Sequence, residues 1–127
     1  MQTNVLAINS KHIGDAFEQR FSHRVKAAGL YISDKMPDRV GFDFLVGCGD
    51  GTLPVERKYV MGGKLRLKHF TPIERIVAED MTAKGVPYTV AFPLFDRIGR
   101  VTWGEIRERL MAGGVMLDNP EWVWEEL

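Results

Sequence analysis

Charged residues interrupt two neighbouring apolar segments of this 127-residue chain. The first segment, residues 41–46, contains Asp43, and the second, residues 53–60, contains Glu56 and Lys58. Burying a carboxylate in an apolar core is costly unless a cation or a metal ion accompanies it. These three residues are therefore the first candidates for chemistry.

The glycine-rich turn between the two segments predicts a β-hairpin. A two-residue tip at 49–50 would place Asp43 opposite Glu56, whereas a tip at 50–51 would place it opposite Lys58. In either register, side-chain alternation puts all three residues on one face, with opposed Cβ atoms about 4.5–5.5 Å apart. A three-residue loop would break this arrangement unless a bulge restored it.

Such a cluster suits metal-assisted hydrolysis of a phosphodiester. Two carboxylates supply the hard oxygen ligands that Mg²⁺ prefers, and Mg²⁺ would polarise the phosphate and help to generate hydroxide. Lys58 would orient the attacking water or offset charge that develops on the phosphate. The alternative is a structural ion pair, in which Lys58 only neutralises Asp43 and Glu56.

The elements that must position these residues alternate along the chain. Apolar residues recur every three or four positions from Ile13 and predict a helix that Gly29 ends. Thr71-Pro72 and Thr102 each begin a helix, with a glutamate three residues after the threonine. The expected elements are helix 13–28, strands 30–33, 40–46 and 53–61, helix 71–84, strand 88–95, a turn at 96–99 and helix 102–111. This order predicts an α/β fold with a mixed sheet flanked by helices, in one domain over residues 1–127.

Composition excludes several classes of protein. With 45% hydrophobic and 27% charged residues the chain is neither disordered nor fibrous. No apolar run is long enough to span a membrane, and the N-terminus lacks the pattern of a signal peptide. The single cysteine, Cys48, excludes an internal disulfide and a zinc finger, so we expect a cytoplasmic protein without a membrane partner.

Positive charge is concentrated locally, although 17 basic and 17 acidic residues cancel over the whole chain. Charged and leucine side chains alternate in residues 64–69, which we call the basic segment. An extended conformation would present Lys64, Arg66 and Lys68 on one edge for contact with phosphates. The alternative is an exposed edge strand whose lysines prevent aggregation.

The order of these residues resembles the PD-(D/E)XK nuclease superfamily, because Asp43 is followed by Glu56-Arg57-Lys58 and preceded by a helix that carries Glu18. The likeness extends to residues 13–18, 41–44 and 55–58 and to the following helix and strand 88–92. Over roughly residues 13–109 the chain is similar to the small Holliday-junction resolvases of archaea and of some bacteria and their phages.

The resemblance implies a restriction-endonuclease-like core that cuts four-way DNA junctions with Mg²⁺, or with Mn²⁺ as a substitute. Asp43 and Glu56 would be metal ligands, Lys58 the catalytic lysine, and Glu18 an acid that reaches the metal directly or through water; Glu18 could equally be a solvated helix residue. The expected DNA contacts are Arg57, Lys64, Arg66, Lys68 and His69. The alternatives are a nuclease for flaps, ends or nicked duplex, and a non-catalytic nucleic-acid-binding module.

Other polar motifs are interpreted as structural. Pro37-Asp38 falls in a loop, five positions from Asp43, and is not expected to be part of the site. Glu74 is expected to cap a helix, although the resemblance implies that a polar residue at the start of this helix can lie near the site. The histidines, His12 and His23 among them, show no metal-binding spacing.

A two-fold symmetric junction cut on opposed strands would need two copies of a chain with one acidic cluster, so we expect a homodimer. Trp122 and Trp124 are candidate dimer surface, or else part of their own core.

Overall fold

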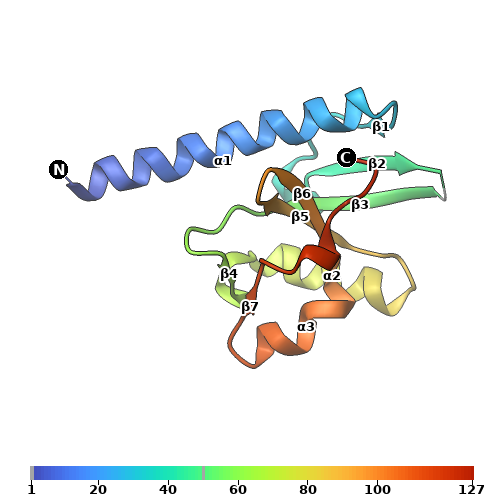
Figure 1. Cartoon of the computed structure of the whole chain (residues 1–127). Helices are drawn as coiled ribbons and strands as arrows, with labels where there is room; N and C mark the ends of the chain where they lie inside the picture. The colour runs from blue at the N-terminus through green and yellow to red at the C-terminus, as the bar shows by residue number, and fades with distance from the viewer. Residues whose placement is uncertain (1, 50) are drawn as a thin grey trace.

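A five-stranded sheet lies between helix α1 on one face and helices α2 and α3 on the other (Figure 1). The computed structural model describes residues 2–49 and 51–127, without the side chains of residues 2–13 and Cys48. The elements are α1 (Gln2–Ala27), β1 (Tyr31–Ile32), β2 (Phe44–Cys48), β3 (Gly51–Arg57), β4 (Lys64–Leu65), α2 (Pro72–Ala83), β5 (Thr89–Leu94), β6 (Arg97–Thr102), α3 (Trp103–Met111) and β7 (Val115–Met116). Short 3₁₀ helices occupy Asp38–Val40, Leu67–His69 and Pro120–Trp122. The predicted α/β class is confirmed.

The sheet is mixed and has the order β1-β2-β3-β5-β6. Strands β3 and β5 are parallel, and the other neighbours are antiparallel. In the β2–β3 hairpin, Phe44 pairs with Val55 and Cys48 with Gly51, which is the register of a tip at 49–50. Of the two registers weighed from the sequence, this is the first; Asp50 itself lies outside the described residues.

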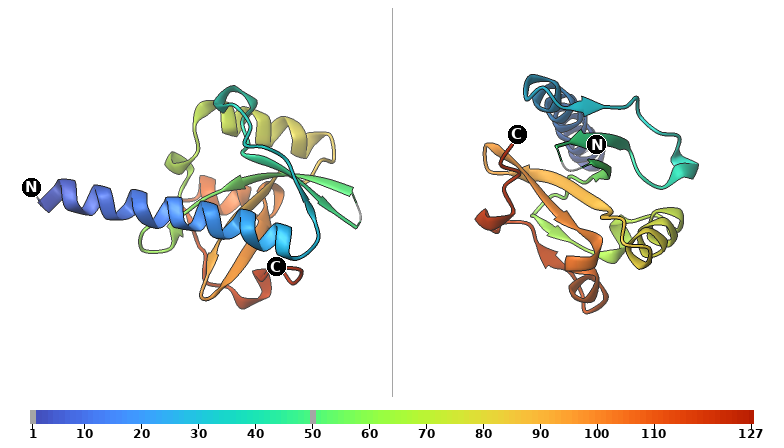
Figure 2. Two further views of the ribbon diagram at one scale, coloured as in Figure 1. Left: turned by 90° about the horizontal axis from the view of Figure 1, so that it is seen from above. Right: turned by 90° about the vertical axis from the view of Figure 1, so that its right-hand side faces the viewer.

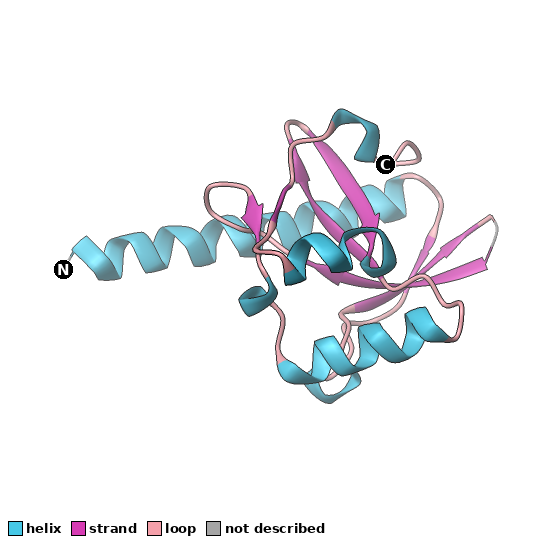
Figure 3. Cartoon of the chain, turned by 90° about the horizontal axis from the view of Figure 1, so that it is seen from below, coloured by secondary structure: helices cyan, strands magenta, loops and turns pink. Residues whose placement is uncertain are grey.

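Each face of the sheet has its own hydrophobic core. Phe17, Phe21 and Val25 of α1 pack against Phe44, Val55 and other residues of one face, together with Trp124. The other face packs against α2 and α3, with Tyr88, Val90 and Trp103 at its centre. Figure 2 shows the three layers end-on, and Figure 3 shows α2 and α3 from the opposite side to α1. Because side chains alternate along β3, Val55 faces α1 and its neighbour Glu56 faces α2.

Several predicted boundaries were wrong. The expected turn at 96–99 is mostly strand: β6 begins at Arg97 and pairs with β5 across the two-residue turn Phe95-Asp96. Phe95 adopts φ 55° to make this turn tight. Helix α1 begins at Gln2 rather than Ile13, and strand 40–46 begins only at Phe44.

The structure decides between the two alternatives for Trp124 and changes the expected form of the basic segment. Trp124 is fully buried and packs on Phe21 with ring centroids 6.0 Å apart, so it belongs to the chain's own core. Trp122 is half-buried against Phe92. In the basic segment only Lys64–Leu65 is strand and residues 67–69 form a 3₁₀ helix, so the expected extended edge is not present.

No helix in the described part of the chain is long and apolar enough to cross a membrane.

Candidate active site

Glu56 and Lys58 lie at the end of β3, on the face that packs against α2. The ammonium of Lys58 lies 3.1 Å from Oε2 of Glu56, as the alternation of strand residues predicts. Glu56 is only 4% exposed. The stem of Lys58 is also largely buried, and its ammonium lies 4.8 Å from the centre of the Phe70 ring. The sequence therefore predicted this pair correctly.

Glu74, on the first turn of α2, is a third member of this group, and it was predicted from the sequence mainly as a helix cap. Its Oε1 accepts hydrogen bonds from the backbone N–H of Thr71 and from Lys58, each at 2.9 Å. The capping interaction was expected, but the contact with Lys58 was not. The capping box fixes the glutamate at the helix start, and tertiary packing brings that start to β3.

Asp43 contacts Arg57, the residue between Glu56 and Lys58. Its N–H donates to the carbonyl of Val55, which is also the ladder partner of Phe44, so two residues face one as in a β-bulge. Its carboxylate instead accepts a hydrogen bond from the backbone N–H of Arg57 at 3.0 Å. The aspartate thus contacts Arg57, whereas the sequence predicted Glu56 or Lys58 directly opposite it.

Arg57 lies between two carboxylates on the α1 side of β3. Its Nη2 lies 3.1 Å from Oε1 of Glu18, and its Nε lies 3.4 Å from Oδ2 of Asp43. The guanidinium packs 4.6 Å from the centre of the Phe44 ring, and the side chain is 7% exposed. Nε is buried and makes no hydrogen bond, so its contact with Asp43 is purely ionic. The guanidinium is thus engaged by both acids, and its expected contact with DNA stays a prediction.

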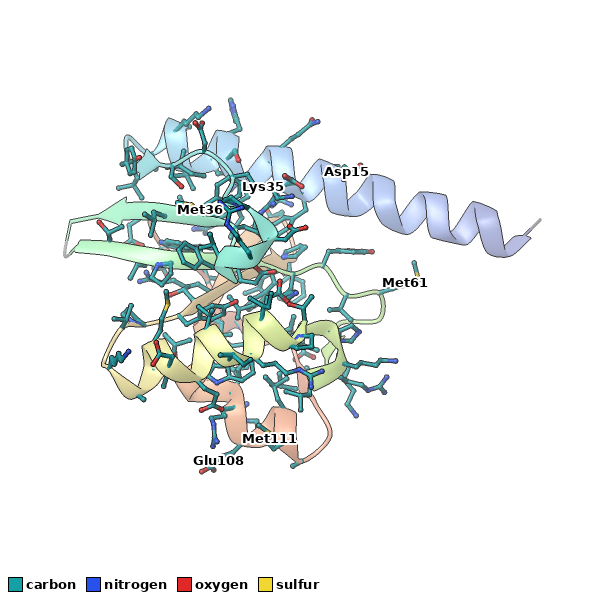
Figure 4. All side chains as sticks on the ribbon, turned by 180° about the vertical axis from the view of Figure 1, so that it is seen from behind. Asp15, Lys35, Met36, Met61, Glu108 and Met111 are labelled. Carbon is teal, nitrogen blue, oxygen red and sulfur yellow. The ribbon has the colours of Figure 1, made fainter. Side chains whose placement is uncertain are left out.

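Three of these acids and both cations border an open cavity of about 680 Å³ between α1 and the end of β3. Glu18, Asp43, Glu56, Arg57, Lys58 and His69 all contribute to its lining. Lys35, beside α1, and Met61, on the loop after β3, border the same cavity (Figure 4). A second, smaller cavity of about 230 Å³ lies on the α2 side, where Asp43, Glu56 and Glu74 contribute to its lining. The predicted catalytic residues therefore surround one space.

Burial dominates the electrostatics of Glu56 and raises its pKa to about 9. The attraction of Lys58 acts in the opposite direction, while the nearby charges of Asp43 and Glu74 add to the increase. Glu56 and Glu74 also share a hydrogen bond, which favours a proton on Glu56. Without a further cation, these effects together favour the protonated form of Glu56.

Glu74 and Glu18, in contrast, stay ionised. Burial by itself raises the pKa of Glu74, but hydrogen bonds from Thr71, Glu56 and Lys58 lower it overall. The pKa of Glu18 is likewise lowered, because Arg57 and Lys35 outweigh the effect of burial. The site thus holds carboxyl groups whose pKa values are shifted in opposite directions, raised for Glu56 and lowered for Glu18 and Glu74, an arrangement typical of functional sites.

The basic segment lies next to this cavity. His69 lines the cavity, and its Nδ1 accepts a hydrogen bond from the backbone N–H of Arg66 at 2.9 Å. Burial and the charge of Lys68 lower the pKa of His69, so its imidazole is neutral at pH 7. Lys64, Arg66 and Lys68 are exposed. The structure therefore keeps these cations near the site, although not along an extended edge.

The structure also places the remaining motifs that the sequence indicated to be structural. Asp38, predicted to lie in a loop apart from the site, begins a surface 3₁₀ helix and lines the smaller cavity together with Asp43, Glu56 and Glu74, so its separation from these acids is not confirmed. His23 is exposed on α1, and the side chain of His12 lies outside the described residues.

The donor chemistry of the site fits a divalent cation. Asp43 and Glu56 are hard oxygen donors on the same cavity, and the buried Glu56 carboxylate needs positive charge nearby in order to ionise at neutral pH. Across the described residues, no three acidic, histidine or cysteine side chains are yet grouped tightly enough to hold a metal ion. Arg57 and Lys58 lie among the carboxylates and neutralise them instead.

The sequence matches no protein-family model. No curated protein resembles it significantly.

Proposed function

We propose that this protein is a structure-selective DNA endonuclease that hydrolyses phosphodiesters with Mg²⁺, and that four-way junctions are its substrate. The observation that carries the proposal is the buried Glu56–Lys58 pair, which lies beside Asp43 at an open cavity. A purely structural ion pair would not require three further charged residues, Glu18, Lys35 and Arg57, around the same cavity. The resemblance of the sequence to small junction resolvases supports the choice of substrate.

Asp43 and Glu56 would hold the Mg²⁺, with Glu18 at the edge of the same site. When bound, the ion would polarise a phosphate and lower the pKa of a coordinated water. Mn²⁺ would substitute, since it accepts the same oxygen ligands. Ionisation of Glu56 is the step that the protein itself must accommodate, because burial raises its pKa to about 9.

Lys58 would act on the reacting phosphate. Its ammonium is held by two carboxylates, Glu56 at 3.1 Å and Glu74 at 2.9 Å, so it is positioned before substrate arrives. A fixed cation of this kind stabilises negative charge that develops on phosphate oxygens and can orient the attacking water. Glu74 is a positioning residue in this scheme.

DNA would bind across the cavity and the basic segment. Lys64, Arg66 and Lys68 are exposed, and each would neutralise a backbone phosphate. Two copies of the chain would be needed to cut opposed strands of a junction, so the active form in this proposal is a homodimer. A cytoplasmic location and a role in DNA recombination and repair belong to the same proposal.

The experiment is a cleavage assay with end-labelled four-way junction, flap, nicked duplex, linear duplex and single strand, each with and without Mg²⁺. We expect paired incisions in the junction that depend on Mg²⁺. Glu108→Gln is the matched control, because Glu108 is an exposed acid on α3, far from Lys35 (Figure 4). It should cleave like the wild type.

Two other results of this assay would change the proposed substrate or overturn the proposed activity. Preferential cutting of flaps or ends would keep the metal site and change the substrate. Binding of DNA without cleavage in Mg²⁺ or Mn²⁺ would overturn the enzymatic proposal and favour a non-catalytic nucleic-acid-binding module.

A further inference from the structure

Arg57 stands between two of the proposed metal-site acids on the α1 side of β3. It contacts Glu18 at 3.1 Å and Asp43 at 3.4 Å, and its side chain is 7% exposed. A guanidinium is always charged, so these two acids carry a permanent internal counter-ion. Lys58 plays the equivalent part for Glu56 and Glu74 on the other side of the strand.

Of the two ion pairs that Arg57 forms, the one with Asp43 is weaker than the one with Glu18. Nε lies 3.4 Å from the carboxylate, is buried and makes no hydrogen bond. A buried donor without a partner costs free energy, which here is offset by ionic attraction and by packing on Phe44. Asp43 keeps a separate hydrogen bond from the Arg57 backbone at 3.0 Å. Its carboxylate can therefore give up the guanidinium without losing its position.

We propose that Arg57 is an internal competitor for the divalent cation, which releases Asp43 when the ion binds and so sets the cation affinity of the site. The inference rests on the proposed metal-dependent function and adds a residue that tunes it. Glu18 would retain the displaced guanidinium, since their contact at 3.1 Å is the shorter one. In the absence of the ion, Arg57 keeps Glu18 and Asp43 close together although both are negatively charged.

The test is calorimetric titration of Mn²⁺, without DNA, into the wild type and into Arg57→Met, which removes the charge and keeps an apolar stem. We expect the variant to bind Mn²⁺ about tenfold more tightly or better, because no cation must leave Asp43. Arg57→Gln provides the same comparison if the methionine variant proves too unstable to purify.

Lys35→Met is the matched control. Lys35 also pairs with Glu18, at 3.7 Å, but it is about half exposed, and within the described residues it forms no ion pair with Asp43. Loss of this cation should change the Mn²⁺ affinity by less than about threefold, since exposed ion pairs contribute little. An equal gain in Lys35→Met and Arg57→Met would show a general charge effect and overturn the inference.

The outcomes separate the inference from the function on which it rests. Equal Mn²⁺ affinity in wild type and Arg57→Met, or weaker binding in the variant, would overturn the role of Arg57 and leave the nuclease proposal intact. Absence of binding in both proteins would overturn the metal-dependent function and the inference together. Thermal unfolding supplies a second readout: the gain in Tm on adding Mn²⁺ should be larger for Arg57→Met than for the wild type.

Discussion

The ammonium of Lys58 lies 2.9 Å from Oε1 of Glu74, a carboxylate that also caps helix α2. One side chain therefore joins the start of a helix to the end of a strand. The position of the proposed catalytic cation depends on this link, since it fixes a flexible four-carbon stem at its charged end.

Glu74→Gln should slow cleavage by about ten- to a hundredfold, because a neutral amide holds the ammonium less firmly than a carboxylate. The measurement is single-turnover cleavage of a labelled junction, alongside the free energy of unfolding. Thr71→Ala separates the two roles of Glu74: it removes the hydroxyl that caps α2 and should cost about 1 kcal/mol of stability with little effect on cleavage. Equal losses of activity in both variants would reduce Glu74 to a cap.

Asp43→Asn, Glu56→Gln and Lys58→Met should each lower the cleavage rate by about a thousandfold or more while junction binding persists. Each removes a proposed metal ligand or the cation that acts on the phosphate. Gel-shift and cleavage assays on the same preparations make the comparison. Substantial turnover by Asp43→Asn would contradict the proposed site.

Without metal, stability should fall as pH rises from about 6 to 9. The pKa of Glu56 is raised from its ordinary 4.5 to about 9, so in this range the folded chain binds a proton that the unfolded chain has lost. The stabilisation is complete below the unfolded pKa and is lost as pH rises through the folded one, with a slope of at most about 1.4 kcal/mol per pH unit. Urea unfolding across this range measures the slope.

The Glu56→Gln variant tests the assignment of that slope, because glutamine cannot titrate. Its stability should vary much less between pH 6 and 9 and should exceed that of the wild type at the alkaline end. An unchanged slope in the variant would assign the pH dependence to another group.

Replacing Lys64, Arg66 and Lys68 together by alanine should reduce the slope of log affinity against log salt by about 0.9 for each lost phosphate contact, or nearly 3 in all. Fluorescence anisotropy with a catalytically inactive Asp43→Asn background gives the affinities. Lys26→Ala, an exposed cation at the end of α1, is the control and should change the slope by less than one contact. An unaltered slope in the triple variant would exclude the basic segment from the DNA interface.

The active species is expected to be a homodimer. Sedimentation equilibrium at micromolar concentration, with and without junction DNA, measures the mass. Since Trp124 is part of the core, Trp124→Ala would report on folding rather than association; the half-buried Trp122 is the better probe of an interface. A chain that stays monomeric on the junction would favour the flap or end nuclease.

Part of the site could be predicted from patterns between residues that are close in the sequence. Strand alternation predicted the Glu56–Lys58 contact, and the threonine caps located the starts of α2 and α3. Strand β6 was missed because a short segment containing Gly99 and two arginines reads as a turn, and only pairing with β5 makes it a strand.

The orientation of Asp43 depends on contacts that are remote in sequence. Gly41 adopts φ 87°, and a Cβ there would lie 2.7 Å from the side chain of Val77 on α2. The Tyr88 hydroxyl donates to the carbonyl of Gly41 at 2.6 Å. These contacts hold the chain in a bend before β2 and produce the bulge. No pattern within residues 40–46 reveals partners in α2 and at the start of β5.

The end of strand β3 separates the charged residues of the candidate site into two groups. Arg57 and Glu18 belong to the side that rests on the α1 core, whereas Lys58 and Glu74 belong to the side that rests on the α2 core. Substitutions deep in one core would shift one cation and spare the other. If the proposed function holds, evolution could therefore adjust the proposed metal site and the proposed action of Lys58 on the phosphate separately, through changes in different hydrophobic layers of one small chain.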